Sequence, residues 1–302
     1  MTYQKNKPKI TIGMPVYNGA DTIKRALDSL LAQTYTNFEL IISDNGSTDS
    51  TSKICLEYEQ KDKRIKYVRK KNTIDIVWNF IFLVEQAKTE YFMWASDDDY
   101  WDPKFIEKNL EVLELHPEIV ASISDIKLVG KNIKKYYSNP NDCNSNNSKW
   151  EFVRPNIGTY KKKIQNVLEF SWSLNIFSIF RTEQLKKCII RKKFVSWDFA
   201  VMLKIIKFGD LNVLDGVLMF RDTGGITSTK SEIEVMKKWN LGWFGTYFPY
   251  VPYTIWCMKN LGLKIFFKNF SHFWYLNTHT GKKILREIIT GVRKKLFDKY
   301  TY

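Results

Sequence analysis

The first half of the chain alternates short apolar runs with segments whose apolar residues recur at helical spacing. A short apolar run bounded by turn residues is typical of a buried strand, and spacing of three and four residues is typical of an amphipathic helix. The predicted strands span residues 9–14, 38–43, 65–69 and 91–95. The predicted helices span residues 21–33, 50–58, 74–87 and 103–115. This alternation predicts an α/β fold with a mostly parallel central sheet flanked by helices.

The second half has a weaker pattern of the same kind. It predicts helices near residues 160–170 and 196–208 and strands near residues 175–180 and 211–220. Residues 139–148 are rich in Asn and Ser and are expected to form a loop.

Polar clusters follow three of the predicted strands, at residues 15–18, 44–49 and 96–99. In an open, mostly parallel sheet, ligands bind outside the carboxyl ends of the strands. The three clusters are therefore expected to lie side by side and to form one binding site.

Three adjacent carboxylates, Asp97, Asp98 and Asp99, are the sharpest chemical signal. They repel one another, and a hard divalent cation such as Mg²⁺ or Mn²⁺ would compensate them while bridging to phosphates. The alternative is a solvated loop or a helix N-terminus before Pro103, where acids are also favoured.

Each of the other clusters has a structural interpretation beside a functional one. Asp44 could accept a hydrogen bond from a nucleobase N–H, or its loop could be a turn and helix cap. Tyr17 could pack on a base, and Asn18 could cap the following helix. Asp198 could be a general base or an acid that stabilises the N-terminus of its helix.

The composition is that of a folded protein. Of the 302 residues, 44% are hydrophobic, too many for a disordered chain. The four cysteines Cys55, Cys143, Cys188 and Cys257 form no C-x-x-C pair, which argues against a disulfide framework or a cysteine zinc site. Residues 1–9 contain no apolar core of a secretory signal. Both features lead us to expect a cytosolic protein.

The formal charge is +15, and the basic excess is concentrated in residues 241–302, with ten Lys and Arg against two acids. Residues 241–258 are uncharged but contain two prolines and many aromatics, which suits an interface better than a bilayer core. Residues 282–299 predict an amphipathic basic helix that could lie on an anionic membrane. The alternative is that both segments pack on the main domain. Nucleic-acid binding is disfavoured because no familiar motif for it appears.

Four stretches together resemble the family 2 glycosyltransferases. They are Ile12–Asn18, which is similar to the first strand and nucleotide loop; Asp44–Asp49, similar to the D-D/N-G-S-T-D motif; Asn72 with Asn79; and Phe92–Pro103, similar to the metal motif. The resemblance is close over residues 8–126 and looser to about residue 230.

The resemblance implies a GT-A fold and inverting transfer of a sugar from a nucleotide-diphosphate sugar, often a UDP-sugar. It implies a catalytic domain over residues 1–235, with a donor half (about 8–126) and an acceptor half (about 127–235), and a helical, aromatic and basic extension over residues 236–302. It implies Asp198 as catalytic base, and Mn²⁺ or Mg²⁺ on Asp98 and Asp99. The nucleotide-sugar contacts would be Pro15, Val16, Tyr17, Asn18, Asp44, Asn45, Asn72, Asn79, Ser96 and Asp97.

The chain departs from the family pattern at three positions. Ser96 stands at the first position of the usual D-x-D-D motif, Trp197 replaces the first acid of an E-D pair, and Thr73 replaces a glycine. The function expected is a hexosyl- or N-acetylhexosaminyl-transferase of bacterial surface polysaccharide synthesis. Its acceptor would be a glycan or lipid-linked oligosaccharide, and it would work in the cytoplasm, peripherally on the inner face of the membrane. The alternative is a degenerate protein that binds a nucleotide sugar or glycan without turnover.

Overall fold

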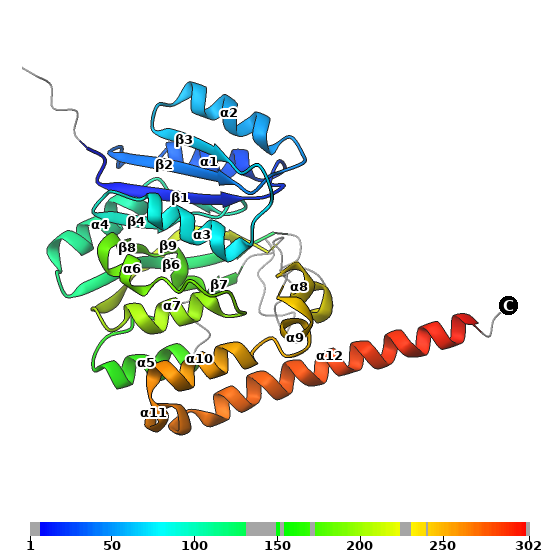
Figure 1. The fold of residues 1–302 in the computed structure, drawn as a ribbon. Helices are drawn as coiled ribbons and strands as arrows, with labels where there is room; N and C mark the ends of the chain where they lie inside the picture. The colour runs from blue at the N-terminus through cyan, green and yellow to red at the C-terminus, as the bar shows by residue number, and fades with distance from the viewer. Residues whose placement is uncertain are drawn as a thin grey trace, which may run out of the picture.

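A mixed, mostly parallel sheet forms the centre of the molecule, with helices on both faces (Figure 1). The computed structural model describes residues 7–130, 149–151, 154–169, 173–223, 231–239 and 241–299. The strand order is β3-β2-β1-β4-β8-β6-β9-β5, with β7 paired to β6. The first four strands in this order are parallel, and β8 is antiparallel to both of its neighbours.

The amino-terminal half supplies the parallel part of the sheet and follows the predicted alternation. Its apolar runs are buried because helices cover both faces, as the near-continuous burial of β1 and β4 confirms. In chain order the elements are β1 (Ile10–Val16), α1 (Ile23–Leu31), β2 (Phe38–Asp44), α2 (Thr51–Lys61), β3 (Ile65–Arg69), α3 (Ile76–Gln86), β4 (Tyr91–Trp94), β5 (Tyr100–Trp101), α4 (Phe105–Leu115) and β6 (Ile119–Val129).

The second half completes the sheet and covers one of its faces. Its elements are β7 (Lys149–Glu151), α5 (Tyr160–Glu169), the 3₁₀ turn η3 (Ser173–Phe177), β8 (Ile179–Arg181), α6 (Thr182–Cys188), α7 (Trp197–Ile205) and β9 (Asp210–Asp222). The long strand β9 runs parallel to β6 and ends close to the start of β5.

A helical region follows, with α8 (Glu232–Lys238), α9 (Gly242–Tyr247), α10 (Val251–Leu261), α11 (Leu263–Lys268) and α12 (Phe270–Lys299). It packs on the sheet domain through α10, where the buried Tyr253 ring lies 6.3 Å from that of Phe194. The inward face of α12 extends the same core with Phe273 and Ile284. Within the part of the chain described, no helix is both long and apolar enough to cross a bilayer.

The sequence did not predict β5, β7 or α6, and three further differences have a clear physical reason. Strand β6 was not predicted, because Ser122 and Ser124 interrupt its apolar pattern. Both serines are nevertheless buried, and each hydroxyl donates a hydrogen bond. Helix α4 begins at Phe105, since Pro103 belongs to the preceding turn and its carbonyl accepts the Thr34 N–H at 2.8 Å. The strand predicted near 175–180 is mostly the turn η3 and only its end pairs as β8. The predicted loop 139–148 and Cys143 lie outside the described residues.

Candidate active site

The three polar clusters predicted from the sequence meet at one edge of the sheet. Strand β1 lies between β2 and β4, parallel to both, so the carboxyl ends of all three strands face the same way. Val16 pairs with Asp44, and the Asn45 N–H donates to the Val16 carbonyl at 2.8 Å. The fold therefore brings the loops after β1, β2 and β4 together.

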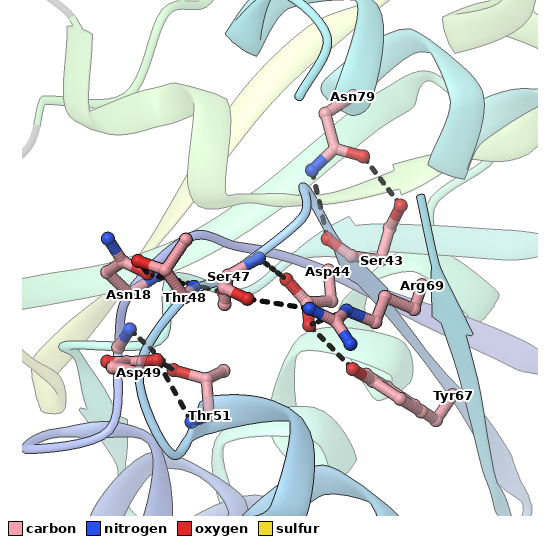
Figure 2. Close-up of polar contacts among 11 residues, drawn as sticks. Asn18, Ser43, Asp44, Ser47, Thr48, Asp49, Thr51, Tyr67, Arg69 and Asn79 are labelled. Atoms are coloured by element: carbon pink, nitrogen blue, oxygen red, sulfur yellow. Dashed lines mark hydrogen bonds and ion pairs between the residues drawn. The ribbon is translucent and has the colours of Figure 1, made fainter. Parts of the chain in front are cut away.

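Asn18 joins the loop after β1 to the loop after β2 (Figure 2). Its backbone has a φ of 52°, its N–H donates to Ser47 Oγ at 2.9 Å, and its Oδ1 accepts the Thr48 N–H at 2.8 Å. Asn18 does not cap α1, because the N-cap residue of that helix is Thr22. The neighbouring Tyr17 is 50% exposed, which leaves its ring open at the edge of the site.

Asp49 fixes the other side of the same junction. Its Oδ2 accepts the Ala20 N–H at 3.1 Å, and its Oδ1 accepts the Thr51 N–H at 3.0 Å. Burial alone would raise the pKa of Asp49, but the hydrogen bonds from Thr51 and Ala20 outweigh burial and lower that pKa. The carboxylate therefore holds the start of α2 against the loop after β1.

Asp44 is fully buried at the end of β2, and each of its oxygens has a protein donor. Oδ1 accepts the Ser47 N–H at 2.8 Å, and Oδ2 accepts the Tyr67 hydroxyl at 2.5 Å (Figure 2). Arg69 Nε lies 3.8 Å from Oδ2, and the guanidinium also donates to the Ser47 carbonyl at 2.8 Å. Arg69 is half exposed and was not predicted from the sequence. Its position at the end of β3, which is parallel to β2, was the signal that could have identified it.

The other three predicted asparagines have different surroundings. Asn45 exchanges hydrogen bonds of 2.7 Å with the Ile74 backbone N–H and carbonyl. Asn79 is buried, accepts from the Ser43 hydroxyl at 2.6 Å and donates to the Ser43 carbonyl at 2.9 Å. Both amides thus hold the loops in place from within, whereas Asn72 is exposed on the loop after β3.

The carboxylate run after β4 is held by contacts from three sides. The Ser96 hydroxyl donates to Asp98 Oδ1, and the Arg25 guanidinium donates to the Asp98 carbonyl at 2.6 Å. Asp99 Oδ1 accepts the Asp222 N–H at 3.0 Å, while Asp99 Oδ2 is buried and has no hydrogen-bond partner among the described residues. The run is therefore held in position with a buried carboxylate oxygen of Asp99 that no described residue satisfies.

The Asp97 side chain lies against Gly19 in the loop after β1. A Cβ on Gly19 would stand 2.0 Å from Asp97 Oδ2, so only a glycine allows this approach. Burial, reinforced by the charge of Asp98, raises the pKa of Asp97 to about 7. The same two causes raise the pKa of Asp99 to about 8, against the opposing charge of Arg221. In both acids burial, reinforced by the charge of Asp98, disfavours the ionised carboxylate, and a nearby positive charge would favour it.

The run fits a hard divalent cation that takes only some of its ligands from the protein. Carboxylate oxygens are the donors that Mg²⁺ and Mn²⁺ prefer, and Asp99 has an unpartnered oxygen. Among the described residues, no three His, Cys, Asp or Glu side chains form a complete metal site. A cation here would need further ligands from a substrate, such as phosphate oxygens.

Asp198 lies in the first turn of α7, where its neighbour determines its position. The Trp197 ring is buried 6.2 Å from that of Trp94 in β4, and its Nε1 donates to the Ile190 carbonyl at 2.7 Å. Trp197 thus anchors α7 to the sheet, while Asp198 stays partly exposed. Burial raises the pKa of Asp198 to about 6, which leaves it mostly unprotonated at neutral pH.

Arg221 on β9 connects Asp198 with the carboxylate run. Its guanidinium lies 5.2 Å from the Phe177 ring, and its charge lowers the pKa of both Asp99 and Asp198. The charge of one side chain thus acts on both acids. Sequence reasoning missed Arg221 because no motif surrounds it and only the sheet topology brings β9 to this edge.

The family model of glycosyl transferase family 2 matches residues 11–183, more than half of the chain. The chain therefore belongs to this family. An uncharacterized glycosyltransferase of Rickettsia typhi is 39% identical over 106 residues, which is 35% of this chain and 32% of the relative. The chain thus spans about a third of the length of this curated relative.

Two solved structures share the fold. S. aureus TarS 1–349 in complex with UDP-GlcNAc has a TM-score of 0.56 at 19% identity, covering 76% of this chain and 65% of that 1–349 chain. The mannosyltransferase PcManGT of Pyrobaculum calidifontis in complex with GDP-Man and Mn²⁺ has a TM-score of 0.58 at 14% identity, covering 96% of this chain and 76% of that protein. The predicted GT-A architecture is confirmed.

Proposed function

We propose that this protein is an inverting glycosyltransferase that moves a sugar from a UDP-sugar to a hydroxyl group of an acceptor. The observation that carries the proposal is the junction of three strand-end loops with Asp198 and Arg221 beside it. The likeness to proteins solved with UDP-GlcNAc and with GDP-Man supports a nucleotide-sugar donor.

The donor nucleotide would lie on the loops after β1 and β2. The exposed Tyr17 ring offers a surface for a base, and Asp44 would accept a base N–H in addition to its protein donors. A buried carboxylate that recognises one base edge discriminates against bases with a different hydrogen-bond pattern. Arg69 beside Asp44 adds a positive charge for the phosphates.

Asp98 and Asp99 would hold Mn²⁺ or Mg²⁺ together with the donor diphosphate. Such a cation would stabilise the negative charge on the departing diphosphate. Ser96 and Arg25 keep Asp98 in place through their hydrogen bonds, and the Asp222 N–H does the same for Asp99. Asp97 would contact the donor ribose from its position against Gly19.

Asp198 would act as the general base. Its carboxylate takes the proton of the acceptor hydroxyl while the hydroxyl oxygen bonds to the anomeric carbon. The bond from that carbon to the diphosphate breaks on the opposite face, and its electron pair leaves with the diphosphate. A single displacement of this kind inverts the anomeric configuration. We place the reaction in bacterial surface polysaccharide synthesis, at the cytoplasmic side of the membrane, with a glycan or lipid-linked acceptor.

Thermal unfolding with UDP-, GDP-, CMP- and dTDP-sugars, with and without Mn²⁺, tests the donor site. A ligand at one hundred times its Kd stabilises the native state by about 2.7 kcal/mol. We expect a Mn²⁺-dependent rise with UDP-sugars that Asp98→Asn abolishes and Asp198→Asn retains. No rise with any nucleotide sugar would contradict the proposal. A rise without transfer to any acceptor glycan would favour a degenerate binding protein.

A further inference from the structure

Large apolar side chains are exposed along α11 and α12, on the side turned away from the sheet domain. Phe267 and Trp274 are each 63% exposed, and Leu285 is 56% exposed. Phe270, Ile288 and Ile289 are exposed in the same region. Aromatic contacts join the first part of this surface, since the rings of Phe270 and Trp274 lie 6.1 Å apart. Contiguous exposed apolar surface of this kind marks an interaction site.

The exposed residues of α12 form one stripe. An α-helix turns by about 100° per residue, so Phe270, Trp274, Leu285 and Ile288 fall within an arc of about 60°. The buried residues Phe273, Thr280 and Ile284 lie on an adjacent side, centred about 90° away, and this side faces the other carboxyl-terminal helices. The helix therefore has a buried apolar side and, next to it, an exposed apolar side that no element among the described residues covers. We call Phe267 and the four stripe residues the apolar stripe.

Cations without acidic partners border the apolar stripe. Lys161, Lys264 and Lys268 line one cavity of about 410 Å³ between α5 and α11, next to Phe267. On α12, Lys282 lies about 60° and Arg286 about 100° around the helix axis from Leu285. Within the described residues none of these five cations has an ion pair, whereas the nearby Lys283 pairs with Glu232. The surface is thus positively charged and aromatic at the same time.

We propose that the apolar stripe and its bordering cations dock this protein on an anionic phospholipid bilayer. The aromatic and aliphatic side chains enter the interface, and the five cations meet lipid phosphates. Helix α12 lies in the plane of the surface, because charged residues interrupt its apolar positions and exclude a spanning arrangement. A second copy of the chain is a poorer occupant, since two such faces would bring like charges together. Figure 1 shows α12 as a long rod that runs past the body of the molecule, which leaves this face accessible.

Sedimentation of the full chain with vesicles tests this proposal without any sugar transfer. One set of vesicles contains phosphatidylcholine alone, and the other contains equal parts of phosphatidylcholine and phosphatidylglycerol. We expect binding to the second set only, weakened by salt. The variant Lys264→Glu, Lys268→Glu, Lys282→Glu should bind at least roughly a hundredfold more weakly, because the loss of each lysine near an anionic surface accounts for roughly fivefold and each introduced carboxylate is repelled.

A matched variant, Lys53→Glu, Lys63→Glu, Lys108→Glu, reverses three exposed lysines on and near α2 and α4. It changes the net charge equally and should retain binding. Equal loss in the two variants would overturn the proposal, because it would mean that only net charge matters. Displacement of the protein from vesicles by inorganic phosphate at constant ionic strength would also overturn it. So would lipid-free self-association that the first variant abolishes.

Trp274 gives a local readout. Brominated lipids quench tryptophans that enter the interface, and the Trp274→Phe variant keeps an aromatic ring there. We expect this variant to bind nearly as well as the parent chain but to lose much of the quenching. Unchanged quenching would mean that other tryptophans contact the lipid, and the apolar stripe would not be the docking surface.

Discussion

At the level of single residues, the candidate site is governed by how burial and charge set the protonation of its acids. Asp97, Asp99 and Asp198 have raised pKa values mainly because burial disfavours their charged forms. Arg221 opposes the shift for the latter two, through one positive charge near both. Asp198, proposed as the base, and Asp99, proposed as a metal ligand, are therefore influenced by the same positive charge.

The pH dependence of transfer should report Asp198. A general base must be unprotonated to accept a proton, so activity is expected to fall as the pH drops through about 6 and to level off above it. Asp198→Asn should lower kcat by roughly 10²- to 10⁴-fold, remove this acidic limb and leave donor binding intact. Steady-state kinetics across pH measures all three effects.

Asp215→Asn serves as the control, because Asp215 is an exposed acid elsewhere on β9. It should keep both the rate and the acidic limb. An Asp198→Asn enzyme with the parental kcat would exclude Asp198 as the base.

At the level of elements, the loops after the strands are held mainly by one another. Gly46, in the loop after β2, has a left-handed backbone with a φ of 79°. A Cβ on it would lie 3.3 Å from the Thr73 backbone nitrogen, in the loop after β3. The exchange of hydrogen bonds between Asn45 and Ile74 joins the same two loops. The shape of the site is thus a property of the assembled loops.

Gly46→Ala should therefore destabilise the protein and weaken donor binding together. The left-handed backbone costs a residue with a Cβ about 1–2 kcal/mol, before the crowding at Thr73 is added. Gly281→Ala is the matched control, because Gly281 lies in α12 with free space around it and should gain slightly in helix propensity. Chemical denaturation of both variants gives the comparison, and equal unfolding free energies would contradict the role assigned to Gly46.

At the level of the whole molecule, the carboxyl-terminal helices have one buried apolar face and one exposed apolar face. Phe273 is buried against α10 and α11, where its ring lies 6.2 Å from that of Tyr253 and stacks 4.8 Å from that of Phe266. Phe267, one helix earlier, is exposed. The sequence left two alternatives open for this region, packing on the main domain and lying on an anionic membrane. The first is observed for the buried residues of α10, whose Tyr253 contacts Phe194. The second is our proposal for the exposed residues of α11 and α12.

Truncation of these two phenylalanines should distinguish how much each face contributes to the free energy of unfolding. Phe273→Ala is expected to lower the unfolding free energy by about 3–5 kcal/mol, because it opens a cavity in the core. Phe267→Ala should change it by less than about 0.5 kcal/mol in solution, since the ring is already solvated. Thermal and chemical unfolding without lipid measures the difference, and similar values for the two variants would mean that the inner face of α12 does not contribute to the core.

The sequence by itself determined the alternation of strands and helices in the first half and the meeting of three loops at one sheet edge. Both follow from local causes: apolar periodicity defines each element, and parallel strands put their carboxyl ends on one side. The tertiary structure alone decided three contacts. Asn79 is buried against Ser43, and the Tyr67 hydroxyl donates to Asp44. The charge of Arg221 acts on both Asp99 and Asp198. These contacts join residues far apart in the chain, and side chains alone do not specify which distant partner they meet. The same reason applies to α12: the sequence predicted an amphipathic basic helix over residues 282–299, but not that the helix begins at Phe270 or which of its side chains the neighbouring helices bury.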